Sequence, residues 1–205
     1  MPLLSGSLDF LLCLTCVAIA AWCARVGNDL LFAGFLWIAA AAFVGAMNLG
    51  GLTWTNDTHR WLSALATGPG MLLVGLGVWA AMLGPFRAGR WLAPALSIGC
   101  AGLIFYLWLA KSPRLGAVTT GMSLLVLVAL PVLAIQAYRA VRPGAAAAAA
   151  SAIGLLLVAG FGVNQLPLAD DGPIRHVDVL HIVLIACYAL VWIGVRGVTQ
   201  RRSWG

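Results

Sequence analysis

Residues 176–196 read HVDVLHIVLIACYALVWIGVR, an apolar run of the length that a helix needs to cross a bilayer. Its first two turns carry His176, Asp178 and His181, and Arg175 precedes them. Ionisable side chains at the edge of a hydrocarbon layer are costly to keep there, so they are candidates for a functional role. The stretch therefore predicts a membrane helix with a polar site at its start.

The composition of the whole chain is that of a membrane protein. Of 205 residues, 62% are hydrophobic and 9% are charged, whereas about a quarter are charged in soluble domains. The net charge of +6 comes from basic residues placed singly or in pairs between apolar runs. This pattern is typical of membrane orientation signals and argues against a nucleic-acid partner. The five cysteines lie inside apolar runs, which indicates buried thiols and no disulfide framework.

Seven apolar runs, separated by short polar breaks, predict an all-α fold. We expect one domain over residues 1–205, a bundle of seven transmembrane helices in the lipid bilayer. The expected helices cover about 8–26, 30–49, 61–83, 91–110, 115–138, 145–165 and 176–196.

Basic residues in alternate loops predict the orientation, because Lys and Arg accumulate on the cytoplasmic side. One side carries Arg25, Arg87, Arg90, Arg139, Arg142, Arg196, Arg201 and Arg202. The other side carries Arg60, Lys111, Arg114 and Arg175. We therefore expect the N-terminus outside and the C-terminus in the cytoplasm. Little lysine beside much alanine, glycine and arginine favours a bacterial source, and hence the plasma (inner) membrane.

The predicted topology brings the three histidines together. The loop that follows the second helix and the loop that follows the sixth open to the same face, so His59 is expected near His176 and His181. Three imidazoles and a water form the ligand set of a catalytic zinc site. His176 and His181 are about 140° apart around a regular helix, so both reach one metal ion only if the helix begins near His176. Otherwise Asp178 is expected to pair with His181, as a ligand or as the carboxylate that orients it.

Other polar residues are expected to line the same pocket. They are Asn48, Asp57, Asn164, Gln165 and Tyr188. Simpler interpretations stay open: His59 as a solvated loop residue, His176 and Asp178 as polar residues at a helix start, and the amides as interhelical hydrogen-bonding groups.

Seven helices, a histidine near the second and a histidine pair opening the seventh resemble the superfamily of alkaline ceramidases, adiponectin/progestin-type receptors and hemolysin III proteins. The resemblance implies a zinc-dependent hydrolase acting on a lipid, with His59, His176 and His181 as ligands. Thr55 stands where that family has a serine, and Thr55 and Asp178 are then the catalytic residues. The chain departs from the family because its histidines are spaced His-x-x-x-x-His and no acid lies between His59 and Asp170.

A second register of the same resemblance places Asn48 at the family's first histidine and His59 near the family's aspartate, which leaves the metal site incomplete. The last helix also resembles that of a group of bacterial multispan proteins that open on His-x-Asp-x-x-His.

Three functions follow as hypotheses. The first is a zinc-dependent membrane hydrolase of a lipid amide or ester, with its site at the outer-leaflet end of the bundle. The second is a binding or sensing protein that uses the same pocket without turnover. The third is a b-type haem protein, with His59 and one histidine of the seventh helix as axial ligands. Lys111, the only lysine, lies in a loop, which argues against a retinal protein.

Overall fold

The computed structural model describes residues 2–49, 51–52, 55–83, 91–166, 168 and 174–199, and every regular element in them is helical. The elements follow in the order α1 (Pro2–Arg25), α2 (Asp29–Leu49), α3 (Asn56–Leu65), η2 (Ala66–Gly70), α4 (Met71–Leu83), α5 (Leu92–Leu109), α6 (Leu115–Arg139), α7 (Pro143–Leu157), η3 (Val158–Gly162), η4 (Val163–Gln165) and α8 (His176–Thr199).

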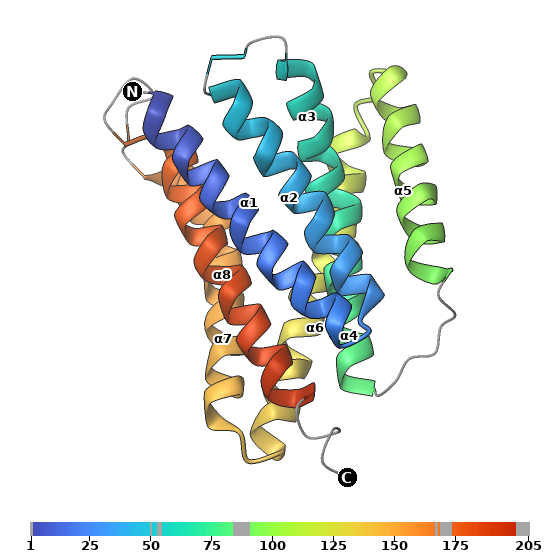
Figure 1. Ribbon diagram of the computed structural model, residues 1–205, viewed down its shortest axis with the longest axis vertical. Coiled ribbons are helices and arrows are strands. Elements are labelled where there is room, and N and C mark those ends of the chain that lie inside the picture. Colours follow the sequence, from blue (N-terminus) through green and yellow to red (C-terminus); the bar gives the residue numbers. More distant parts are fainter. Residues whose placement is uncertain are drawn as a thin grey trace.

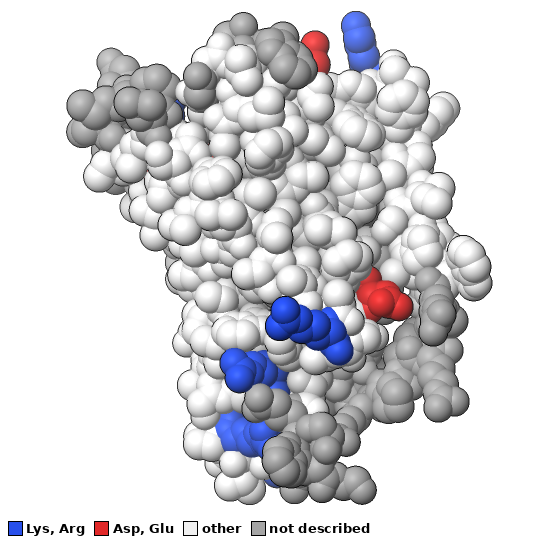
Figure 2. Space-filling view, viewed as in Figure 1, with Lys and Arg blue, Asp and Glu red and all other residues white. Residues whose placement is uncertain are grey.

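Seven helices in the described residues are long and apolar enough to cross a membrane, as predicted. They are Leu4–Arg25, Asp29–Leu49, Asn56–Met82, Leu92–Leu109, Leu115–Arg139, Pro143–Gly162 and His176–Thr199. Successive helices run up and down the bundle (Figure 1). On the face drawn in Figure 2, the charged side chains lie towards the two ends and a broad uncharged band separates them. This is the surface that a lipid bilayer requires.

Two helices begin earlier than the sequence predicted. The first begins at Pro2 rather than near residue 8, and the third begins at Asn56 rather than near residue 61. A helix satisfies its own backbone hydrogen bonds, so it continues past the apolar run into the polar boundary without penalty. As a result His59, predicted in a loop, lies in the first turn of α3.

One stripe of α1 is buried, and it begins with two polar side chains and continues with cysteines and aliphatic residues. Its members recur every three or four residues, so they share a helix face. They are Ser5, Asp9, Leu12, Cys16, Ile19 and Cys23, none more than 5% exposed. The two polar members come first, at the N-terminal end of the helix.

The buried stripe of α8 has the same organisation. Asp178 and His181 occupy its first turns, followed by Cys187, Tyr188 and Val191. Each of the two helices thus has one face directed into the bundle. On that face the first turns carry polar residues and the later turns carry mainly apolar residues. Because α1 and α8 begin at the same end and pack side by side (Figure 1), the polar residues of the two faces meet.

Glycines let α2 approach its neighbours closely. A Cβ on Gly34 would lie 2.8 Å from the Gly70 carbonyl oxygen, and a Cβ on Gly77 would lie 2.7 Å from the Leu31 backbone nitrogen. Such contacts between backbones are typical of membrane helices, where small residues form the interfaces. They hold α2 against η2 and α4, and so place the start of α3 over α2.

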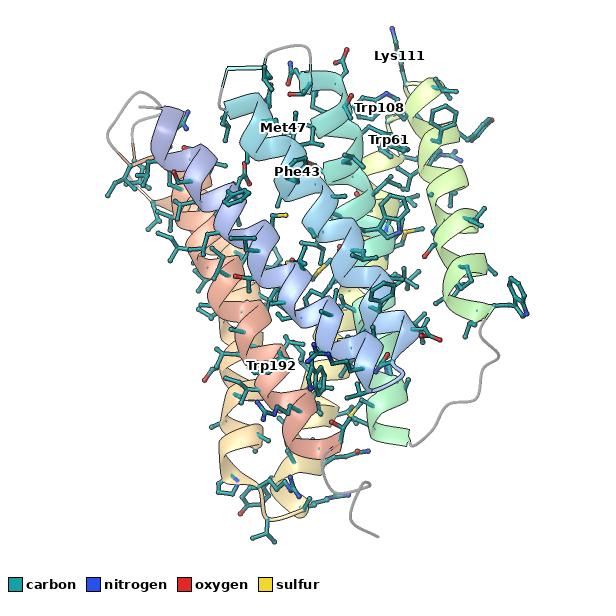
Figure 3. The ribbon with its side chains drawn as sticks, in the orientation of Figure 1. Phe43, Met47, Trp61, Trp108, Lys111 and Trp192 are labelled. Carbon is teal, nitrogen blue, oxygen red and sulfur yellow. The ribbon has the colours of Figure 1, made fainter. Side chains whose placement is uncertain are left out.

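Aromatic side chains mark the level of the two ends. Trp61 and Trp108 lie near the end from which Lys111 projects, whereas Trp192 lies towards the other end (Figure 3). Trp61 packs edge-on against Phe105 with ring centroids 6.2 Å apart. Tryptophan gathers at membrane interfaces, and its position on α3 and α5 is consistent with one interface at this level.

Candidate functional site

Six side chains form a group where α1, α3 and α8 begin, which we call the polar cluster; three of them are buried and three are partly buried. Its members are Ser5, Asp9, His59, Arg175, Asp178 and His181. Ser5 is 0% exposed, and Asp9 and Asp178 are each 2% exposed. Burying ionisable groups without partners costs several kcal/mol or more, so their pairing decides whether the cluster is stable. The pairs fall into two layers along α1 and α8.

The inner layer is an aspartate–histidine pair that joins α1 to α8. His181 Nε2 lies 3.0 Å from Asp9 Oδ1. An ionised carboxylate only accepts hydrogen bonds, so with Asp9 ionised and His181 neutral the hydrogen of the imidazole lies on Nε2. Nδ1 of His181 is buried and has no hydrogen-bond partner among the described residues. The lone pair on His181 Nδ1 therefore takes part in no hydrogen bond within the described residues.

His59 approaches the same pair from α3, across a glycine of α2. Its Nδ1 lies 3.3 Å from the Ala41 carbonyl oxygen, so Nδ1 is the protonated nitrogen of the neutral ring. A Cβ on Gly45 would lie 2.6 Å from Asp9 Oδ2 and 2.8 Å from His59 Cε1. Only glycine fits between these two atoms, and its lack of a side chain is what lets α1 and α3 side chains meet.

The outer layer ties the starts of α1 and α8 together. The Ser5 hydroxyl donates to Asp178 Oδ1 and accepts from Arg175 Nη2. Asp178 Oδ2 accepts from the Arg175 backbone nitrogen at 2.9 Å, which also caps the first turn of α8. Arg175 Nε is 3.8 Å from the same oxygen. Asp178 is therefore bound to Ser5 and Arg175, whereas Asp9 is the carboxylate that orients His181.

Replacing Gly45 with alanine is expected to separate Asp9 from His59 and to loosen the pair, because the new methyl group overlaps both side chains. Carbethoxylation of histidines, followed by mass spectrometry, should show a severalfold rise in modification of His181 and His59 relative to His176. Gly121→Ala is the matched control, since a Cβ there meets nothing within 4 Å. Equal protection of His181 in the two variants would contradict this role of Gly45.

The three histidines predicted as zinc ligands do not come together as a metal site. All three lie in the described part of the chain, which contains no group of three or more His, Cys, Asp or Glu residues placed to hold a metal ion. His176 Nε2 instead lies 2.9 Å from the Leu166 carbonyl oxygen, and His181 faces Asp9. The residues present therefore do not fit a three-histidine zinc site, and no chemical step is derived through zinc.

Other predicted residues also lie apart from the polar cluster. Thr55 is buried, and its hydroxyl donates to the Leu52 carbonyl oxygen at 2.6 Å. The Tyr188 hydroxyl contacts Met71 Sδ at 3.5 Å, and its ring packs edge-on against Phe35, so Tyr188 belongs to the apolar core. Asp57 is exposed.

The amides predicted to line the pocket are likewise not bonded to the cluster. Asn48 is half-buried near the end of α2, and Gln165 is exposed. Within the described part, no hydrogen bond joins either side chain to the cluster. The Asn164 side chain lies outside the described residues.

Sequence reasoning missed Asp9 and Ser5. The expected first helix, 8–26, has Asp9 at its start and leaves Ser5 outside it. The spacing of four residues between them, continued by the small residues Cys16 and Cys23, was the signal that both lie on a buried helix face.

Taken together, the contacts join two carboxylates, an imidazole and a guanidinium at one end of the bundle. A carboxylate that holds one nitrogen of an imidazole sets its tautomer, and the other nitrogen is then ready to take a proton. A second carboxylate, Asp178, is kept at the same end by an arginine and a serine. The cluster has the parts for binding and moving a proton within a helical bundle.

The fold and the cluster define a class: a helical protein that has, in its described residues, seven helices of membrane-crossing length and a cluster of ionisable side chains at one end. The chain belongs to a family of unknown function (DUF6962), whose model matches residues 5–200. That match includes every residue of the polar cluster. Neither the curated proteins nor the solved structures contain a match to the chain.

Proposed function

We propose that this chain is an integral membrane hydrolase of a lipid amide or ester, in which His181 is the general base and Asp9 orients it. The observation that carries the proposal is the buried Asp9–His181 contact of 3.0 Å with His181 Nδ1 left without a partner. A fixed tautomer with one open lone pair is the arrangement that proton abstraction from water requires.

The reaction follows from that geometry. His181 Nδ1 takes a proton from a water molecule, whose oxygen adds to the carbonyl carbon of the lipid. The Asp9 carboxylate stabilises the resulting imidazolium without itself taking up the proton. When the bond from the carbonyl carbon to nitrogen or oxygen breaks, the imidazolium returns its proton to the leaving group. The products are a fatty acid and an amine or an alcohol.

The depth of the pair suits a lipid substrate. Asp9 and His181 each lie five residues inside their spans, which begin at Leu4 and His176. At a rise of 1.5 Å per residue, both lie about 8 Å below the end of the span. The amide and ester groups of membrane lipids lie between the hydrocarbon and the headgroups, and so towards the same end of a span as the pair. The substrate then enters from the side of the bundle.

We place the polar cluster in the outer leaflet of a bacterial plasma membrane. The support is the distribution of basic residues along the sequence: eight fall in the ends and loops on the opposite side, against four, Arg60, Lys111, Arg114 and Arg175, on the side of the cluster. Loops with more Lys and Arg stay in the cytoplasm. The N-terminus is then outside and the C-terminus inside.

A second candidate is a proton-binding sensor without turnover. It is favoured by the burial of both carboxylates, each 2% exposed, since a proton reaches such groups more readily than a lipid does. Haem ligation by His59 and one histidine of the last helix stays a prediction, and a Soret band in the purified protein is its test.

The proposal is tested by incubating the purified protein in nanodiscs with a panel of lipid amides and esters and measuring the released fatty acid by mass spectrometry. We expect turnover that persists after dialysis against a chelator, because the residues of the site do not assemble a zinc triad. Loss of all turnover on chelation, restored by zinc, would contradict the metal-free mechanism. Proton uptake without any turnover would favour the sensor.

A further inference from the structure

The outer layer of the polar cluster carries a binding function of its own. We infer that Arg175 binds the phosphate of a lipid headgroup, and that it exchanges Ser5 and Asp178 for this phosphate when the lipid enters. The inference deepens the proposed function, since it names phosphate-bearing lipids as the substrate class.

The first support is the geometry of the Arg175–Asp178 pair. The guanidinium approaches the carboxylate only through Nε, at 3.8 Å, and this is not the forked contact with two short hydrogen bonds that arginine prefers. Its Nη2 donates to Ser5, which is a neutral acceptor. Most of the five donors of the guanidinium therefore have no acceptor in the described part of the chain.

The second support is the difference in exposure between the two partners. The Arg175 side chain is 27% exposed, whereas that of Asp178 is 2% exposed. The guanidinium therefore offers an open side to the surroundings, while the carboxylate offers none. An anion that arrives from the headgroup region meets the arginine first. Phosphate has the oxygen geometry that the guanidinium fork matches.

The third support is the position of Arg175 relative to the pair. Arg175 precedes His181 by six residues, which is about 9 Å along a helix. It lies outward of His181, because α8 begins at His176. In a phospholipid the phosphate likewise lies outward of the acyl carbonyls, at the end of a short glycerol linker. A lipid whose phosphate binds Arg175 thus has its carbonyls near the level of His181.

The exchange also opens the way to the pair. Ser5 Oγ contacts both Arg175 and Asp178, and it is four residues, or one turn, outward of Asp9 on the same face of α1. When Arg175 turns to a phosphate, Ser5 loses one of its two partners. The starts of α1 and α8 are then held together less tightly, directly outward of Asp9 and His181.

The experiment measures how much lipid is bound, a quantity that can be read without an activity assay. Delipidated protein is titrated with phosphatidylglycerol or with diacylglycerol of the same acyl chains, and bound lipid is counted by native mass spectrometry. We expect the wild type to prefer phosphatidylglycerol by about tenfold, and Arg175→Gln to lose most of that preference. Arg175→Lys should keep part of it, because it retains the charge but not the fork.

Arg114→Gln is the matched control, since Arg114 is an exposed arginine in a loop at the same end. It should bind like the wild type. An unchanged preference in Arg175→Gln, or an equal loss in Arg114→Gln, would overturn the inference. If inorganic phosphate at equal concentration displaced phosphatidylglycerol, the site would bind free phosphate as well as the lipid, and the inference that a lipid headgroup is its ligand would be overturned.

The two proposals fail separately. Selective binding that depends on Arg175 in a protein without turnover would retain this inference and remove the hydrolase. Turnover that depends on His181 but shows the same headgroup preference in Arg175→Gln would retain the hydrolase and remove the inference about Arg175.

Discussion

Replacing Asp9 with asparagine should lower turnover by roughly 10²–10⁴-fold while leaving the fold intact. The amide is close to the carboxylate in shape but carries no charge, so the imidazolium formed during proton transfer loses its stabilising partner. The amide also presents an N–H group to His181 Nε2, which favours the tautomer with the hydrogen on Nδ1. That tautomer has no lone pair at the position that takes the proton.

The measurement is the initial rate of fatty-acid release by each variant on the substrate that the wild type hydrolyses fastest. Asp57→Asn is the control, because Asp57 is an exposed carboxylate in the first turn of α3 at the same end of the bundle. It should keep the wild-type rate. An Asp9→Asn rate within a few-fold of the wild type would show that Asp9 does not orient the base.

The largest expected effect on stability comes from Asp178→Ala. The change leaves two donors without their acceptor, the Ser5 hydroxyl and the Arg175 backbone nitrogen, and it removes the charge partner of the Arg175 guanidinium. Removing one partner of a buried ion pair typically costs 3–5 kcal/mol, and the partial exposure of Arg175 reduces this to about 2–4 kcal/mol. Asp178→Asn should lose less, because the amide oxygen still accepts.

Unfolding in mixed micelles by titration with sodium dodecyl sulfate measures this difference. Asp57→Ala should unfold like the wild type, since its carboxylate is exposed. If Asp178→Ala and Asp57→Ala unfolded at the same detergent fraction, the outer layer of the polar cluster would contribute nothing to holding α1 against α8.

The architecture could be predicted from the sequence because each membrane helix is decided locally. In lipid, the backbone N–H and C=O groups of a continuous apolar run find no water, so the run forms a helix that satisfies them internally. This logic gave the seven spans, including the last, which begins at His176 in both the prediction and the structure. It failed at the polar ends: the turn that contains His59 is too polar to count as part of a span, yet it continues α3.

The site could be predicted only in part. Alternation of the loops correctly placed the starts of α3 and α8 at one end, where His59 and His181 both lie beside Asp9. The same alternation also places the start of α1 at that end, and following it would have brought Asp9 into the site.

The pairing of the charges was beyond the sequence. Asp178 and His181 are three residues apart, so a direct partnership was the natural expectation. The structure divides them instead, because Ser5 and Asp9 of α1 approach the two residues separately. Which of two nearby carboxylates orients a histidine depends on how α1 and α8 are packed, and no local pattern encodes that packing.

The central claim is that Asp9 holds His181 with Nε2 protonated and Nδ1 open. Nitrogen-15 NMR of the imidazoles tests it directly, since the chain has three histidines and His181→Gln assigns one set of signals. We predict one protonated and one unprotonated nitrogen for His181, with the protonated signal displaced in Asp9→Asn. A His181 ring whose two nitrogen signals are the same in the wild type and in Asp9→Asn would contradict the account.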